Sequence, residues 1–195
     1  ADSMALELEK KGILKRDKFY EIWGTAKGNR PDPSEYLSAE YIKKHLDKFR
    51  KGASRLVDGD TYINRVASNG GVVGNPEPYY IDGKLYSSSE FISTKGDIDN
   101  VIFRAKKSPD FESSIVESLG LTDWELQKYK ISGIRRYDVS GDFLDSLNAR
   151  IPSGNEPGAF LMDWIPGGFT LGGSAEIILD KFPLDDIIGK MTILS

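Results

Sequence analysis

The sequence contains no cysteine and a single histidine, His45, among its 195 residues. Without cysteine there are no disulfides, no thiolate nucleophile, no cysteine-ligated zinc and no iron–sulfur cluster. A single histidine also excludes a histidine-rich metal site and a two-histidine nuclease mechanism within one chain. We therefore expect the chemistry of this chain to need no metal.

Long apolar runs are also missing. No stretch approaches the roughly 18 apolar residues that span a bilayer, so we expect no membrane span. Residues 1–12 lack the apolar core of a signal peptide. The net charge of −4 argues against a protein whose main task is to coat phosphate backbones, because such proteins are usually basic.

Helical spacing and capping residues concentrate the predicted helices in the first two thirds of the chain. Ser38 and Asp97 are expected N-caps, Gly120 is an expected helix end, and Thr122 with Glu125 has the capping-box spacing. The predicted helices cover residues 3–22 with an interruption at Gly12, 39–51, 97–107, 109–119 and a short segment that begins at 122.

Strands are predicted mainly in the last third, because the apolar period changes there from 3.6 towards 2. The segments are 129–139, 159–165, 175–179 and 191–194, preceded by brief extended pieces at 55–57 and 78–81. This order predicts an α+β fold in which N-terminal helices are followed by a mainly antiparallel sheet. The Gly- and Pro-rich stretch around residue 30 suggests an N-terminal helical extension, 1–29, and a catalytic domain, 30–195.

His45 lies on the apolar face of its predicted helix, near Tyr41 and Phe49. An imidazole in such a place most often forms a hydrogen bond to a backbone carbonyl. A general base is the alternative, although nothing nearby in the sequence identifies a nucleophile for it.

A glycine-rich stretch, Gly167-Gly168-Phe-Thr-Leu-Gly172-Gly173, runs directly into a strand that begins near Glu176. It matches neither a Walker A motif nor a dinucleotide fingerprint, and a hairpin turn would explain it. A glutamate near the start of an apolar strand can, however, face a cleft. Trp164 and Phe169 flank the first glycines and either line a pocket for a planar ligand or belong to the core.

A second polar cluster consists of Arg150, Ser153, Asn155 and Glu156. A cation, a hydroxyl, an amide and a carboxylate in one turn would suit a phosphate or ribose clamp. The same residues would also suit a structural turn with Asn155 in the left-handed conformation.

The motifs RPDPSEYLS, EYIKKHLDKF and GASR, followed by IPSGNE and WIPGG, resemble a C-terminal domain of bacterial polymorphic toxins over about residues 30–190. Such domains end long secreted carriers, such as LXG proteins and contact-dependent inhibition proteins. The resemblance implies secretion within a larger carrier, action in the cytoplasm of a target cell and neutralisation by a cognate immunity protein. A chain that begins at Ala1 fits a fragment of a longer protein.

The order of features is also similar to ADP-ribosyltransferase folds and to the necrotizing-toxin type of NAD glycohydrolase. Those folds use an arginine on an early strand, a serine-rich strand and a late acidic residue after a flexible loop. Arg55, the Ser87-Ser88-Ser89 run and Glu176 match these positions. The run departs from the Ser-Thr-Ser pattern, and Ser174 stands where many transferases have a second glutamate.

The resemblance implies that NAD is the substrate and assigns roles to these residues. Glu176 would stabilise positive charge that develops on the ribose, and Arg55 would hold the pyrophosphate. Ser89 would orient the glutamate or the ribose, and Trp164 or Phe169 would stack on nicotinamide. Arg55 and Glu176 should then face one cleft with Ser89 between them.

Two reaction types and two other functions stay open. Ser174 favours NAD hydrolysis over transfer, while a protein or nucleic-acid acceptor is possible. A metal-independent ribonuclease would use His45, Glu156 and Arg150, aided by a basic helix. A non-catalytic binding module is the third class. The lysines and arginine of that helix are Lys43, Lys44, Lys48, Arg50 and Lys51.

Overall fold

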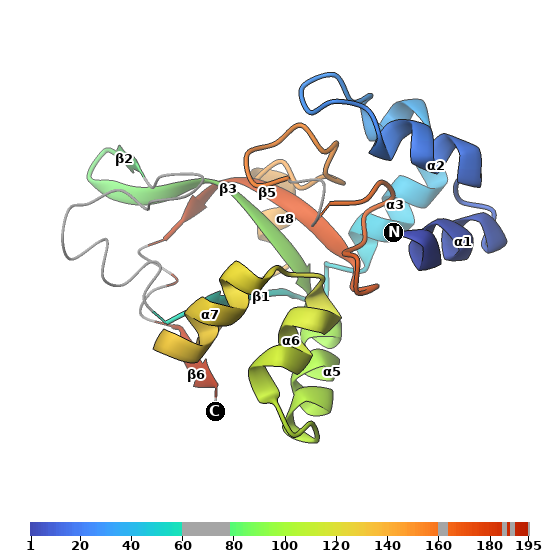
Figure 1. Ribbon diagram of the computed structural model, residues 1–195. Coiled ribbons are helices and arrows are strands. Elements are labelled where there is room, and N and C mark those ends of the chain that lie inside the picture. The colour runs from blue at the N-terminus through green and yellow to red at the C-terminus, as the bar shows by residue number, and fades with distance from the viewer. Residues whose placement is uncertain (60–78, 160–163, 185–186, 188–189, 195) are drawn as a thin grey trace.

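The computed structural model describes residues 1–59, 79–159, 164–184, 187 and 190–194 (Figure 1). For residues 79–80, 87–89, 143 and 181–183 the description covers the backbone. The helices are α1 (Asp2–Lys10), α2 (Arg16–Trp23), α3 (Ala39–Asp47), α5 (Lys95–Lys106), α6 (Phe111–Leu119), α7 (Asp123–Ser132) and α8 (Phe143–Ser146), with a 3-10 turn, η1 (Pro33–Glu35). The strands are β1 (Ala53–Asp58), β2 (Tyr79–Ile81), β3 (Lys84–Thr94), β4 (Ile134–Val139), β5 (Glu176–Pro183) and β6 (Thr192–Leu194).

The six strands form one sheet in which every pairing is antiparallel. The order β2-β3-β1-β4-β6 runs across the sheet, and β5 lies on the other edge of β3. The α+β class and the antiparallel sheet are therefore confirmed.

The sheet divides between β1 and β3. These strands pair through two positions, Ala53 with Thr94 and Ser54 with Ser93, whereas β1 and β4 pair along the whole of β1. Towards its other end, β3 pairs with β2 on the same edge. Among the described residues, β1 thus turns away from β3 immediately after Ser54, and Arg55 is the first side chain beyond this fork.

Helices cover both faces of the sheet. One face, here called the α3 face, packs against Phe49, which follows α3, and Leu144 of α8. The opposite face, here called the α5 face, packs under α5, α6 and α7. Alternation along β1 follows this division, since Ala53 and Val57 belong to the first core and Leu56 belongs to the second.

A third core joins the two ends of the chain. Phe19 of α2 is fully buried, and Leu8 of α1 is 1% exposed, in a cluster with Trp164 and Ile165. Phe91 of β3 packs against this cluster. Residues 1–29, the predicted extension, therefore share a hydrophobic core with the C-terminal third of the chain.

Local capping chemistry accounts for several of the helix ends. Ser38 accepts a hydrogen bond from Tyr41 N, and Gly120 ends α6 with a positive φ of 67°. Thr122 and Glu125 form the expected capping box of α7. At α5, however, Thr94 is the N-cap in place of Asp97, and its hydroxyl accepts from Asp97 N.

The predicted division into early helices and late strands is wrong. The brief extended pieces expected at 55–57 and 78–81 correspond to β1 and β2, but periodicity did not predict β3, which is 11 residues long and lies in the middle of the chain. Residues 129–132, expected as strand, belong to α7, where Tyr129 is buried beneath the helix. Most of the predicted strand 159–165 lies outside the described residues. No helix in the described part of the chain is long and apolar enough to cross a membrane.

Candidate functional site

The fork between β1 and β3 holds a buried polar cluster on the α3 face. The Arg55 guanidinium forms an ion pair with the Glu90 carboxylate, which also accepts a hydrogen bond from the Tyr137 hydroxyl at 3.2 Å. Arg55 and Tyr137 are direct cross-strand partners. The side chain of Glu90 is 2% exposed and that of Arg55 is 31% exposed, so the pair extends from the interior to the surface.

Glu90 was not among the residues predicted from the sequence. It follows the serine run directly, and its side chain is placed by the alternation of β3. A carboxylate between Ser89 and Phe91 gives a weak signal on its own. Glu90 and Arg55 are 35 residues apart in the sequence, so their pairing depends on contact between two different strands.

Arg55 reaches β3, the strand that carries the serine run, through its ion pair with Glu90. Ser87 and Ser89 lie in β3 opposite Phe182 and Asp180 of β5. The side chain of Ser89 lies outside the described part of the structure, so its expected role stays a prediction.

Arg55 and Glu176 do not share a cleft. Glu176 pairs with Ser93, which in turn pairs with Ser54, so all three side chains lie on the α5 face. Arg55 follows Ser54 and therefore points to the α3 face, as its contact with Tyr137 requires. The predicted arrangement of Arg55 and Glu176 around one substrate is wrong for this reason.

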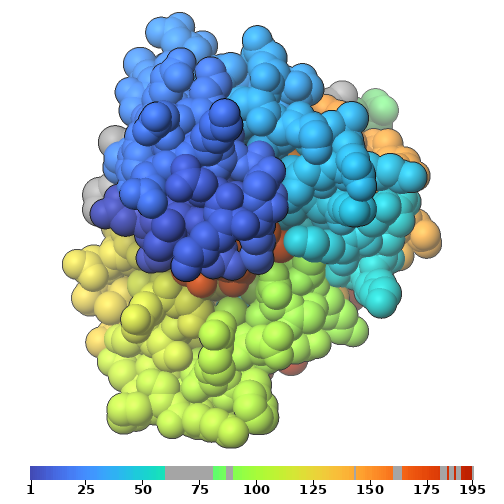
Figure 2. All heavy atoms as spheres, turned by 90° about the vertical axis from the view of Figure 1, so that its right-hand side faces the viewer, coloured from blue at the N-terminus to red at the C-terminus, as the bar shows by residue number. Residues whose placement is uncertain are grey.

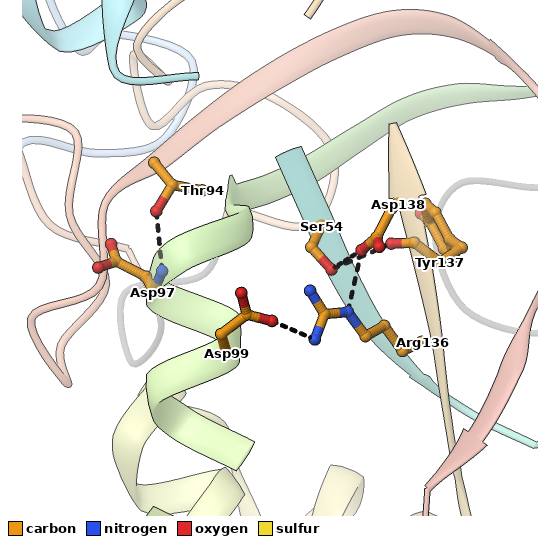
Figure 3. A network of polar contacts seen from close by, with 7 residues as sticks. All are labelled: Ser54, Thr94, Asp97, Asp99, Arg136, Tyr137 and Asp138. Carbon is orange, nitrogen blue, oxygen red and sulfur yellow. Dashed lines mark hydrogen bonds and ion pairs between the residues drawn. The ribbon is translucent and has the colours of Figure 1, made fainter. Parts of the chain in front are cut away.

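Four polar side chains instead form a row across the α5 face. Asp138, Ser54, Ser93 and Glu176 are successive cross-strand partners from β4 to β5. The Ser54 hydroxyl donates to Asp138 at 2.6 Å, and Arg136 forms ion pairs with Asp138 and with Asp99 of α5 (Figure 3).

These contacts set the ionisation of the acid at one end of the row. Burial alone would raise the pKa of Asp138, but the hydrogen bonds from Ser54 and Arg136 outweigh it and leave the pKa below its usual value. Asp138 therefore remains ionised at neutral pH and anchors Arg136 against α5.

Glu176 begins β5, and its backbone is fixed on both sides. Its N–H donates to the Gly168 carbonyl at 2.8 Å, and its carbonyl accepts from His45 Nε2 at 3.0 Å. The residue is 9% exposed. The glycine-rich loop that precedes it folds back as a hairpin, with bridges from Trp164 to Thr170 and from Phe169 to Ala175.

His45 is the buried imidazole that its helical position predicts. A carbonyl oxygen only accepts, so Nε2 carries the hydrogen and Nδ1 is bare. Nδ1 is buried with no hydrogen-bond partner among the described residues. Because protonation would place a charge in this environment, burial lowers the pKa of His45 to about 4. His45 positions the backbone of Glu176 and is unsuited to act as a general base.

Gly168 adapts the loop to this histidine. Its φ is 87°, and a Cβ at this position would lie 2.6 Å from His45 Nε2. A side chain here would therefore be strained and would also push against a ring packed on Phe169. The expected hairpin thus has a tertiary reason for one of its glycines.

Trp164 and Phe169 are used for packing. Trp164 is 2% exposed, its indole donates to the Pro152 carbonyl, and the Arg30 guanidinium lies 4.4 Å from its ring centroid. Phe169 packs edge-on against His45. The structure gives both aromatics core contacts, which is the second of the two roles expected from the sequence.

The predicted cluster of Arg150, Ser153, Asn155 and Glu156 forms hydrogen bonds and an ion pair with other parts of this chain. Glu156 accepts from the backbone N–H groups of Ser153 and Gly154, and Asn155 bonds to the backbone of residues 28 and 30. Arg150 pairs with Asp180 at 3.0 Å. The left-handed residue in this turn is Gly154, with φ 92°, and not Asn155 as predicted.

The residues of the predicted nuclease centre each have a structural partner. His45 is bound to Glu176, Glu156 to its own turn and Arg150 to Asp180. Part of the basic helix is neutralised, because Lys44 pairs with Glu40 and Arg50 with Asp47. No group of acidic residues or histidine that could hold a metal ion occurs in the described part of the chain.

The fold and these two polar centres define an α+β protein with an antiparallel, forked sheet. No protein-family model matches the chain, and no curated protein matches it either.

Proposed function

We propose that this chain is the enzymatic domain of an antibacterial toxin that consumes NAD. The observation that carries the proposal is the adjacency of β1, β3 and β5, with β3 in the middle and a fork on its β1 side. These are the strands that contain Arg55, the serine run and Glu176. The resemblance described above names the same three features, in the same order along the chain.

Glu176 is the carboxylate we assign to the reaction. It follows a glycine-rich loop, and its pairing with Ser93 places it on the α5 face of the sheet. Cleavage of the bond between nicotinamide and ribose sends the bonding electrons to nicotinamide and leaves positive charge on the sugar. A carboxylate beside the ribose stabilises that charge.

Water is the acceptor we favour. It adds to the ribose carbon and releases a proton, so the products are ADP-ribose, nicotinamide and one proton. The residue two positions before Glu176 is Ser174, which is 5% exposed and accepts no proton as readily as a carboxylate. The alternative is transfer of the ADP-ribose group to a protein or nucleic-acid acceptor whose nucleophile needs no such base.

Arg55 becomes a positioning residue in this proposal. Its guanidinium is bound to Glu90, on the face opposite to Glu176. The ion pair fixes β1 against β3 at the fork, and breaking a buried pair costs about 3–5 kcal/mol because one charge stays buried. Arg55 thus supports the divided sheet and does not touch the substrate.

The test is the cellular NAD concentration after the chain is expressed, compared with the Glu176→Gln variant. We expect rapid loss of NAD with the parent and none with Glu176→Gln. Glu40→Gln is the matched control, because that carboxylate is 77% exposed on α3, and it should deplete NAD as the parent does. Circular dichroism of each purified variant confirms that it is folded.

Two outcomes would contradict the proposal. Growth arrest with an unchanged NAD concentration would exclude NAD consumption as the toxic activity. Degraded total RNA from the same cells would then indicate a ribonuclease. Full NAD loss with Glu176→Gln, but none with a folded Glu90→Gln variant, would move the reaction to the Arg55 face. An inert parent chain would favour a binding module.

A further inference from the structure

A groove lies between α5 and the glycine-rich loop. Its volume is 350 Å³, which is near the lower end of the roughly 300–1,000 Å³ typical of ligand pockets. In the space-filling view, atoms from late in the sequence fill the seam between the N-terminal helices and the α5–α6 pair (Figure 2). The groove is lined by Asp97, Asn100, Phe103, Arg104, Gly172, Gly173 and Ser174.

The groove contains two polar side chains that have no partner among the described residues. Within the described part of the chain, neither the Arg104 guanidinium nor the Asn100 amide has a hydrogen-bond or ion-pair partner. Most other arginines discussed above, such as Arg55, Arg136 and Arg150, have an acidic partner. Arg104 is therefore able to bind an anion without breaking an existing contact.

The helix places these groups along one stripe. Asp97, Asn100 and Arg104 are spaced by three and four residues, so they follow each other along the same face of α5. At 1.5 Å per residue, Asp97 and Arg104 are separated by about 10 Å along the axis. The groove therefore has a carboxylate at one end and a guanidinium at the other.

An exposed aromatic ring lies at the cationic end. Phe103 is 59% exposed, and the ammonium group of Lys107 lies 4.1 Å from its ring centroid. An exposed phenyl ring beside two cations is a surface on which a base can stack while a phosphate binds next to it.

The opposite wall is close-packed backbone. A Cβ at Gly172 would collide with the Ser118 carbonyl, so α6 fixes the position of the loop. At the acidic end, Asp97 accepts a hydrogen bond from Ala175 N at 2.8 Å. Ala175 precedes Glu176 directly, so the groove and the proposed catalytic residue are joined by one short segment.

We infer that this groove binds the nucleoside monophosphate portion of the substrate, with Arg104 on the phosphate, Phe103 against the base and Asn100 on the ribose hydroxyls. The inference rests on the proposed function in naming NAD as the whole substrate. The volume suits one nucleotide, which leaves the reacting nicotinamide ribose to extend towards Glu176.

The experiment is calorimetric titration of AMP into the purified chain. We expect AMP to bind, and Arg104→Gln to weaken it about ten-fold or more, because a hydrogen-bonded charge is lost. Phe103→Ala should weaken binding as well, while adenosine, which lacks the phosphate, should bind equally to the parent and to Arg104→Gln. Lys106→Gln is the control, since it makes the same charge change on α5 outside the groove.

Absence of AMP binding at millimolar concentration, or equal binding by the parent and Arg104→Gln, would overturn the inference. A parallel measurement of NAD turnover distinguishes a failure of the groove assignment from a failure of the proposed function. If NAD is consumed but the affinity for AMP does not depend on Arg104, only the groove assignment is wrong. If AMP binding depends on Arg104 but NAD is not consumed, the groove assignment stands and the proposed function is wrong.

Discussion

Single residues in this protein gain their roles from their tertiary partners. His45 has ordinary helical surroundings in the sequence, yet the structure buries it completely against Glu176 and Phe169. Glu90 is inconspicuous in a serine-rich segment of the sequence, but in the structure it binds both Arg55 and Tyr137. In both cases the chemistry follows from burial and one neighbouring group.

The lowered pKa of His45 predicts a loss of stability in acid. The folded state binds the proton with a pKa of about 4, whereas the unfolded chain binds it near 6.5. The unfolded state therefore gains protons first as the pH falls, and the free energy of unfolding should drop by about 3 kcal/mol between pH 6.5 and 4. Urea unfolding at several pH values measures this drop.

The control is His45→Gln, which removes the titrating group. Its stability should fall less steeply over the same range, because only the carboxylates remain to titrate. A direct check is the NMR shift of the one histidine ring, which should stay that of neutral imidazole down to about pH 5. A midpoint near 6.5 would contradict the buried, neutral assignment.

At the scale of elements, separate loops are joined by side-chain clamps. The side-chain oxygen of Asn155 accepts hydrogen bonds from Gly28 N and Arg30 N, and its NH2 group donates to the Arg30 carbonyl. The three distances run from 2.7 to 3.1 Å. Arg30 itself stacks over Trp164. The stretch around residue 30, expected as a linker, is thereby held against the loop that precedes β5.

Removing this clamp should open the loop around residue 30. We expect Asn155→Ala to lower the free energy of unfolding by about 2 kcal/mol, since three hydrogen bonds are lost from a partly exposed site. Trypsin should then cleave faster after Lys27. Asn29→Ala, which changes an exposed neighbour, should leave both properties unchanged. Equal protease resistance of Asn155→Ala and the parent would show that the clamp is not needed.

At the scale of the whole molecule, three cores share one sheet. The α3 and α5 faces each have their own cluster, and α1 and α2 complete a third cluster with Trp164 and Ile165. The N-terminal helices are therefore structurally continuous with the region that leads to Glu176.

We expect a chain that lacks residues 1–29 to lose cooperative unfolding and to bind a hydrophobic dye, because Trp164 and Ile165 become exposed. In the full chain, Phe19→Ala should cost about 3–5 kcal/mol, since the side chain is fully buried. Leu6→Ala is the matched control on α1, where the residue is 39% exposed, and should cost under about 1 kcal/mol. A shortened chain with an unchanged melting temperature would contradict this prediction.

Features that depend on neighbouring residues could be predicted from the amino-acid sequence. The capping box at Thr122, the end of α6 at Gly120 and the break at Gly12 follow from local hydrogen bonding and backbone freedom. The α+β class follows from the periodicity of apolar residues. These predictions held because the interacting groups lie within a few residues of each other.

Apolar periodicity did not predict the strand at residues 84–94, and only the tertiary structure sets the side of the sheet that each polar residue faces. Serine-rich β3 has weak intrinsic preference and is held by pairing with β1, β2 and β5. A shift of one residue reverses the face of a side chain, so chain order could not place Arg55 and Glu176. Strand register, which long-range packing sets, separated these residues and joined Arg55 to Glu90.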